Sequence, residues 1–175
     1  MAKPLLFWPL SGVSAADRLS IINLLATHAG TRGMVGGQMV DMEVEGHPID
    51  LPTLEYIHTH KSGALIKAAV DIGGIIGGSL PEQRDALQRY AAAVGLAFQI
   101  ADDILDVTAK TEEMGKPSGS DQQRGKATYP ALLGLTQARE RARELNEVAI
   151  SALQIFGLEA QPLRAIAGYI IERSY

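Results

Sequence analysis

Three aspartates near position 104 are the residues of this chain whose types and spacing best suit chemistry. Asp102, Asp103 and Asp106 form a DDxxD pattern within a largely apolar stretch from Val94 to Val107. At about 100° per residue, Asp102 and Asp106 fall on one helix face one turn apart, and Asp103 lies at the edge of that face. Because a helix that is apolar on most of its surface is buried among other helices, we expect these carboxylates to point into an internal polar cavity.

Buried carboxylates repel one another, so a cation has to compensate their charge. A set of oxygen ligands without His or Cys favours a hard cation, and Mg²⁺ commonly bridges one or two carboxylates to substrate phosphates. Lysines in two other segments, Lys61 beside a glycine and Lys116 and Lys126 in a later Gly- and Pro-containing stretch, supply the charge that a diphosphate needs. A less specific interpretation stays open at this point, in which the aspartates form a solvated helix face and each lysine is an ordinary surface residue.

Helical patterns surround the acidic segment along nearly the whole chain. The predicted helices cover Ser14 to Gly30, 33–43, Asp50 to the glycines at 73–78, Ser79 to about Val107, Pro130 to near Phe156, and Pro162 to Glu172. Capping residues mark three of these starts, at Ser14, Asp50 and Ser79, the last with Glu82 in the arrangement of a capping box. No strand alternation and no repeat occur in the sequence, which predicts an all-α fold, and we interpret 108–126 as a functional loop.

Glycines beside the chemical residues indicate where helices come close or bend. Gly33, Gly36 and Gly37 would let another backbone approach the second helix, and Gly63, directly after Lys61 and Ser62, predicts a kink or a close approach in the third.

Composition narrows the functional classes. The 175 residues are 46% hydrophobic and 21% charged, which suits one globular domain, and the net charge of -4 without long runs of like charge gives no support to a nucleic-acid partner. No stretch is long and apolar enough for stable membrane insertion. The absence of cysteine excludes disulfides and thiolate metal sites. We expect a cytoplasmic protein.

Four ordered blocks of sequence resemble the trans-prenyl diphosphate synthases of the polyprenyl synthetase family, and most closely their bacterial farnesyl branch. The blocks are 33–41 (GMVGGQMVD), 60–66 (HKSGALI), 98–106 (FQIADDILD) and 115–121 (GKPSGSD) running on to 125–130 (GKATYP), and the terminal 169–173 (YIIER) also fits. The resemblance implies an isoprenoid-synthase-type helical bundle that is usually homodimeric. It also implies a magnesium-dependent prenyltransferase that condenses an allylic diphosphate with isopentenyl diphosphate to form geranyl or farnesyl diphosphate.

The resemblance also implies roles for individual residues. Asp102 would be the principal ligand of a magnesium ion on the allylic diphosphate, supported by Asp103 and Asp106. Lys61 and Lys116 would contact that diphosphate, with Lys126 further along the same loop. The remaining residues would face the reacting end of the substrate or line its cavity, and these are Ser62, Gln99, Gln38 and Asp41. For Gln38 and Asp41 a packing role is a nearly equal alternative.

One part of the family pattern is missing from this sequence. The family has an earlier aspartate-rich motif and a basic site for isopentenyl diphosphate, whereas DDxxD occurs here once, and residues 1–13 do not resemble the family's helix before Ser14. We therefore expect 14–175 to be the C-terminal portion of a synthase domain, truncated at its N-terminal side, with 1–13 as an atypical segment. Such a chain would have negligible activity alone and would tend to self-associate. The alternatives are a non-catalytic regulatory or interaction subunit derived from a synthase, and a plain helical bundle.

Overall fold

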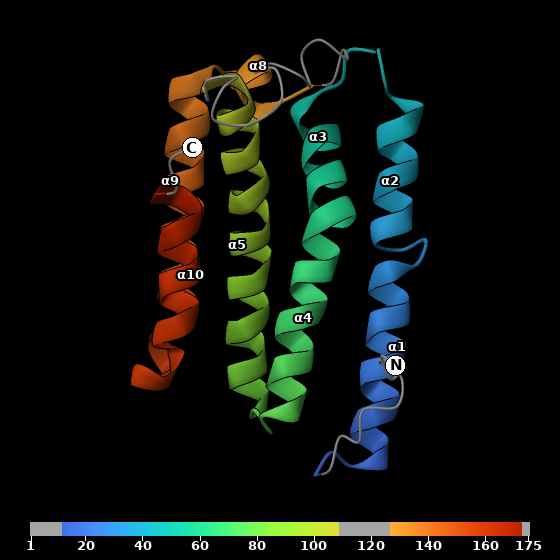
Figure 1. Ribbon diagram of the computed structural model, residues 1–175, viewed down its shortest axis with the longest axis vertical. Coiled ribbons are helices and arrows are strands. Elements are labelled where there is room, and N and C mark those ends of the chain that lie inside the picture. The colour runs from blue at the N-terminus through green and yellow to red at the C-terminus, as the bar shows by residue number, and fades with distance from the viewer. Residues whose placement is uncertain (1–11, 109–126, 173–175) are drawn as a thin grey trace, which may run out of the picture.

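The computed structural model describes residues 12–108 and 127–172, and every regular element in those ranges is a helix (Figure 1). This confirms the predicted all-α class. The elements are α1 (Ala15–Ala29), α2 (Met34–Glu43), α3 (Leu51–Ile57), the π-helix η2 (His58–Ser62), α4 (Gly63–Ile76), α5 (Pro81–Thr108), α8 (Tyr129–Leu133), α9 (Leu135–Ala152), the short 3₁₀ turns η3 (Leu153–Ile155) and η4 (Leu158–Ala160), and α10 (Gln161–Glu172). Most of the predicted atypical segment 1–13 and most of the predicted loop lie outside the described residues.

Two predicted helix starts are confirmed in atomic detail. The Ser14 hydroxyl accepts a hydrogen bond from the Asp17 amide at 3.1 Å, and the Asp50 carboxylate accepts one from the Thr53 amide at 3.0 Å. Both residues have extended backbone angles, as capping residues do. Pro52 lies in the first turn after Asp50, where a missing amide hydrogen costs nothing.

Two other predictions about helix ends were wrong. The Ser79 hydroxyl does not cap α5, because it donates to the Gly74 carbonyl at the end of α4, and the capping contact is made instead by the Gln83 side chain, which accepts from the Leu80 amide at 2.8 Å. The helix predicted from Pro130 to Phe156 is broken at Gly134, where φ is +84°, into α8 and α9. Only glycine enters that backbone region readily, so this residue permits the break.

The predicted irregularity at Gly63 is confirmed and has a specific form. Residues His58–Ser62 make a π-helical turn between α3 and α4, so the three elements form one continuous run with a wider turn in the middle. The run also comes close to α5 here, since a Cβ at Gly95 would lie only 3.4 Å from the Cα of Gly63. Wider turns of this kind occur mostly as single insertions and often at functional sites.

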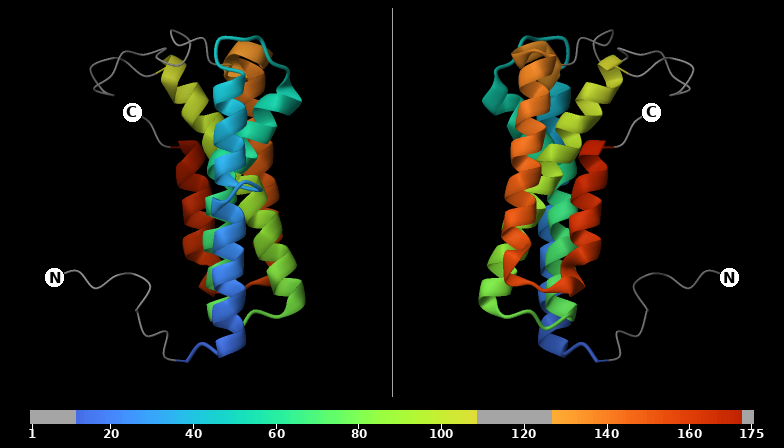
Figure 2. Two further views of the ribbon diagram at one scale, coloured as in Figure 1. Left: turned by 90° about the vertical axis from the view of Figure 1, so that its right-hand side faces the viewer. Right: turned by 90° about the vertical axis from the view of Figure 1, so that its left-hand side faces the viewer.

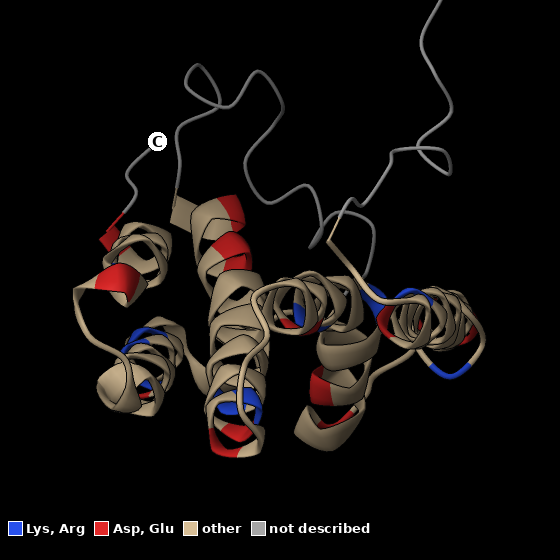
Figure 3. Ribbon diagram, turned by 90° about the horizontal axis from the view of Figure 1, so that it is seen from below, with Lys and Arg blue, Asp and Glu red and all other residues tan. Residues whose placement is uncertain are grey.

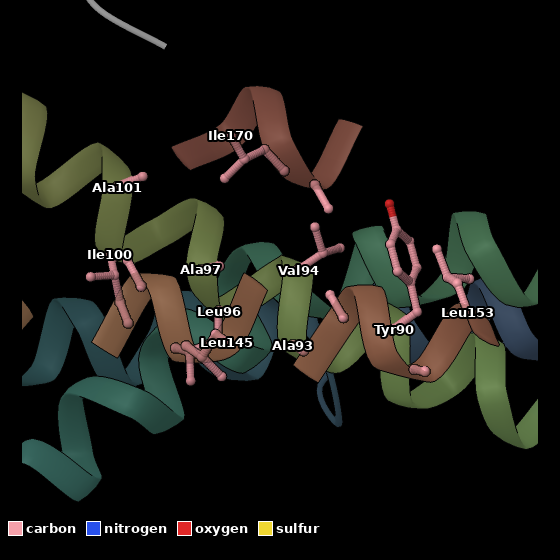
Figure 4. Packing of buried hydrophobic residues seen from close by; sticks show 14 of the residues in the cluster. Tyr90, Ala93, Val94, Leu96, Ala97, Ile100, Ala101, Leu145, Leu153 and Ile170 are labelled. Atoms are coloured by element: carbon pink, nitrogen blue, oxygen red, sulfur yellow. The ribbon is translucent and has the colours of Figure 1, made fainter. Parts of the chain in front are cut away.

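The helices form an elongated bundle with α5 at its centre. It packs against α4 on one side and α9 on the other, and α10 lies beside α5 and α9 (Figures 1 and 2). The core between them is one cluster built on α5 and its partners, in which Leu145 lies beside Leu96 and Leu153 lies beside Tyr90 (Figure 4).

Tyr90 anchors α10 to the same core. Its ring is buried, and its hydroxyl donates to the Leu163 carbonyl at 2.9 Å. The helix at the centre of this core is therefore the one that carries the acidic residues.

The apolar residues of α1 lie mainly on the outside of the described bundle. No residue of α1 is buried, and Leu19, Ile22 and Leu25 are 68, 59 and 48% exposed although they recur at helical spacing. Among the described helices, none combines the length and the apolar character that crossing a bilayer requires.

Candidate active site around the acidic end of α5

The charged residues of α5 lie toward its two ends, with an apolar stretch between them (Figure 3). At the C-terminal end, Asp103 is 8% exposed and Asp106 is 2% exposed, whereas Asp102 is exposed. The interpretation that all three aspartates form a solvated helix face is therefore wrong for Asp103 and Asp106, which are buried. The expectation that all three point into an internal cavity is wrong for Asp102.

Asp103 is held by two hydrogen bonds from other parts of the chain. Its Oδ2 lies 3.0 Å from Nε2 of His58 on the π-helix, and the same oxygen accepts the backbone amide of Tyr129 at 2.9 Å. An ionised carboxylate only accepts hydrogen bonds, so the hydrogen in the first contact belongs to the imidazole whenever Asp103 is ionised. The residue therefore connects α5 with η2 and with the start of α8.

A second contact joins the start of α8 to α3. The Tyr129 hydroxyl donates to Oε1 of Glu55 on α3 at 2.6 Å, and the His58 and Tyr129 rings stack with centroids 5.8 Å apart. Burial, together with the hydrogen bond to Glu55, raises the pKa of Tyr129 well above its ordinary value, so the phenol stays protonated and remains a donor. His58, Glu55 and Tyr129 were not among the site residues predicted from the sequence.

A detectable signal existed for His58, because it stands in the otherwise apolar stripe of Leu54 and Ile57, both of which are buried. A buried polar side chain needs a partner, so this position could have been marked as part of a network.

Lys61, in the second of the four sequence blocks, is held by a residue of the first block. Its Nζ lies 2.7 Å from Oδ2 of Asp41 on α2, and both side chains are partly buried. The close approach predicted from the glycines of α2 is confirmed at Gly37, where a Cβ would lie 2.3 Å from the Lys61 backbone nitrogen. An ammonium has three N–H donors, so the bond to Asp41 leaves Lys61 able to bind a further anion.

The other predicted site residues are placed on the same elements. Ser62 ends the π-helix, Gln38 lies on α2 and Gln99 lies on α5 one turn before Asp102 and Asp103, and all three are half-buried. Their roles stay predictions. Lys116 and Lys126 lie outside the described residues.

The donor chemistry at the end of α5 suits magnesium bound together with a phosphate ligand. In the part of the chain that the structure describes, no group of three or more acidic, His or Cys side chains could hold a metal alone. Magnesium keeps several waters and is usually bound by one or two carboxylates plus substrate phosphates. The exposed Asp102 on the last turns of α5 is accessible for such a contact, whereas Asp106 is buried. The site therefore fits a magnesium–diphosphate complex better than a free ion.

Comparison with known families agrees with this chemistry. The family model described as polyprenyl synthetase matches residues 4–154. The chain belongs to the polyprenyl synthetase family. Among its relatives, the farnesyl diphosphate synthase of Escherichia coli is 48% identical over 166 residues, covering 93% of this chain and 56% of that protein. The dimethylallyltranstransferase of Fischerella ambigua is 46% identical, covering 94% of this chain and 48% of that protein.

Solved structures of the family share the fold. An FPP/GFPP synthase from Zymomonas mobilis matches with a TM-score of 0.78 and 42% identity over 90% of this chain and 52% of that one. A geranyltransferase from Helicobacter pylori, complexed with magnesium and isoprenyl diphosphate, matches with a TM-score of 0.74 and 31% identity over 93% of this chain and 54% of that one. The chain thus spans about half the length of the relatives that it matches.

Proposed function

We propose that the acidic end of α5 and the π-helix of this chain bind the magnesium-complexed diphosphate of an allylic substrate, for prenyl transfer to isopentenyl diphosphate. The observation that carries the proposal is that η2, which carries Lys61, packs against α5, with His58 of η2 bonded to Asp103 in the acidic turn of α5, residues 102–106. The family supports the same chemistry, since its members named above make farnesyl diphosphate or transfer allylic groups.

The residues take distinct parts in this binding. Asp102 is the principal magnesium ligand, and Asp103 and Asp106 support it. Lys61 and Lys116 neutralise the diphosphate, and Lys126 extends that basic set. When bound, magnesium supplies Lewis-acid stabilisation of the departing diphosphate.

Asp41 contributes by fixing the direction of the Lys61 ammonium, because a 2.7 Å ion pair limits the rotamers of a long side chain. Ser62, at the end of the same turn, faces the carbon end of the substrate, while Gln38 and Gln99 line its cavity. A positioned donor set of this kind stabilises charge where it develops during the reaction.

The isolated 175-residue polypeptide should bind a magnesium–diphosphate complex without forming product. It contains DDxxD once, so only part of the charge on the leaving group would be stabilised. A non-catalytic partner subunit of a complete synthase is the alternative that the single motif favours. We further propose that the protein is cytoplasmic and forms a homodimer. Sedimentation analysis of the purified chain would check the dimer.

Calorimetric titration with magnesium and inorganic diphosphate tests the binding site. A ligand at 100 times its dissociation constant stabilises the folded state by about 2.7 kcal/mol, so melting temperature provides a second readout. Asp102→Asn should abolish both effects, whereas Asp85→Asn, an exposed acid on the same helix about 25 Å away, should leave them intact. Lys61→Gln and its control Lys67→Gln form a second pair. Equal behaviour within each pair, or no binding by the unmodified chain, would refute the proposal.

A condensation assay separates the synthase from the partner subunit. Radiolabelled isopentenyl diphosphate and geranyl diphosphate are supplied to the chain alone and to the chain mixed with an inactive full-length synthase whose second acidic motif has been removed. Product from the mixture would support a catalytic portion, while product from the chain alone would contradict the expected inactivity.

A further inference from the structure

The carboxylate of Asp103 is held by groups from two other segments of the chain. Its Oδ2 is occupied by His58 and by the Tyr129 amide, at 3.0 and 2.9 Å, and only 8% of the residue is exposed. A buried carboxylate with two hydrogen bonds on one oxygen is stabilised where it lies and would lose both bonds on turning toward another ligand.

The contacts of Asp103 close a ring through three helical elements. His58 and Glu55 lie three residues apart on the continuous α3–η2 run, Tyr129 bonds Glu55 through its hydroxyl, and Tyr129 bonds Asp103 through its amide. The side-chain rings of His58 and Tyr129 also stack on each other, with centroids 5.8 Å apart. The members of the closed ring of contacts fix one another, so the loss of any one bond loosens the others.

Three of the four members of the ring lie close in sequence to residues of the proposed diphosphate site. Asp103 precedes Asp106 by three residues and follows Asp102 directly, His58 precedes Lys61 by three residues on the π-helix, and Tyr129 begins the first helix after the basic segment. The ring therefore fixes the position of the acidic turn of α5 relative to the π-helix that carries Lys61.

We propose that Asp103 is a positioning residue, which orients Lys61 and the start of α8 toward the acidic turn through His58 and the Tyr129 amide rather than by binding metal. The inference rests on the proposed function and specifies how Asp103 supports it. Partners behind the ligands of a metal site typically change its affinity by 10–100-fold when they are removed.

Asparagine separates positioning from metal binding at this residue. Its carbonyl oxygen can accept the same two hydrogen bonds, but it carries no charge for a cation. Glutamine at 58 similarly keeps an N–H donor close to the position of Nε2. Alanine at either position removes the bond altogether.

The first measurement is calorimetric titration of the full chain with magnesium and inorganic diphosphate. We expect Asp103→Asn and His58→Gln to bind within about 3-fold of the unmodified chain, and Asp103→Ala and His58→Ala to bind at least about 10-fold more weakly. Tyr90→Phe, which removes a buried hydroxyl bond about 20 Å along α5, controls for destabilisation and should not change the affinity. Loss of affinity in Asp103→Asn together with full affinity in His58→Ala would overturn the proposal, because it would place the charge of Asp103 on the metal.

The second measurement needs no ligand and is amide hydrogen exchange at Lys61, Ser62 and Tyr129. Asp103→Ala and His58→Ala should speed exchange at all three amides at least about 10-fold, and Asp103→Asn should restore protection, since local opening follows the loss of packing and bonds. Unchanged exchange in both alanine variants would overturn the proposal. If the unmodified chain binds no magnesium–diphosphate but shows this exchange pattern, the proposed function fails while the positioning role of Asp103 stands.

Discussion

Replacing Gly37 by alanine tests how closely α2 must approach the π-helix. A Cβ on Gly37 would lie 2.3 Å from the Lys61 backbone nitrogen and 2.8 Å from Cβ of His60. Carbon atoms in contact prefer about 3.5–4.0 Å, so the two elements would have to separate by about 1 Å. Overpacking in a filled interior costs roughly 1–3 kcal/mol, and we expect the upper end because one of the blocking atoms is backbone.

The same substitution at Gly73 is a matched control with the opposite sign. Gly73 lies inside α4, and a Cβ there meets nothing within 4 Å. Alanine is favoured over glycine in a helix by about 0.5–1 kcal/mol, so Gly73→Ala should stabilise the chain while Gly37→Ala destabilises it. Because both variants add the same methyl group, a difference in stability between them reports the surroundings of each glycine.

Urea unfolding and thermal unfolding, both followed by circular dichroism, measure the change in stability of the two variants. For a domain of this size, about 1 kcal/mol corresponds to 2–4 °C, so Gly37→Ala should lower the melting temperature by roughly 6–12 °C. Its affinity for magnesium–diphosphate should fall as well, because the displaced backbone carries Lys61. A Gly37→Ala chain as stable as the unmodified one, with an unchanged urea dependence, would show that α2 and η2 do not meet at this distance.

Three smaller predictions concern stability. Tyr129→Phe removes the donor to Glu55 and should lower the free energy of unfolding by about 1–2 kcal/mol, and urea unfolding that shows no loss would mean that the 2.6 Å bond is not formed. Gly134→Ala should cost about 1–2 kcal/mol, because φ is +84° there, and a stabilised variant would contradict the break between α8 and α9. Burial raises the pKa of Asp71 in the folded state, so the folded chain holds this proton more tightly than the unfolded chain and loses stability as pH rises. Asp71→Asn should therefore raise the melting temperature at pH 7, with the gain shrinking at acid pH, and a gain that grows on acidification would refute this sign.

Local features of the fold could be predicted because their causes lie within a few residues. Ser14 and Asp50 cap helices through bonds to amides three residues later, and such contacts depend on little else. The break at Gly134 could not be predicted from local sequence, since a glycine inside a helical pattern is compatible with continuing the helix or with ending it. The choice depends on packing against α5 and α9, which the local sequence does not contain.

The candidate site was predictable in its parts but not in its connections. Periodicity grouped Asp102 with Asp106 and placed Asp103 at the edge of their face, whereas in the structure Asp103 and Asp106 are buried and Asp102 is exposed. The bond from Asp103 to His58 joins residues 45 positions apart, and the bond from Lys61 to Asp41 joins residues 20 apart. Neither separation leaves a signal in one sequence, so the pairings emerge only when the helices are packed.

The π-helix explains how one short segment serves two neighbours. In a regular α-helix, residues three apart share a face, so His58 and Lys61 would point toward the same partner. Here His58 reaches α5 and Lys61 reaches α2, because the wider turn of η2 rotates the two side chains apart. Residue types do not distinguish this turn from an α-helical one, and Gly63 gave the one hint of it. The wider turn therefore allows His58 to bond to Asp103 on α5 while Lys61, in the same five-residue segment, pairs with Asp41 on α2.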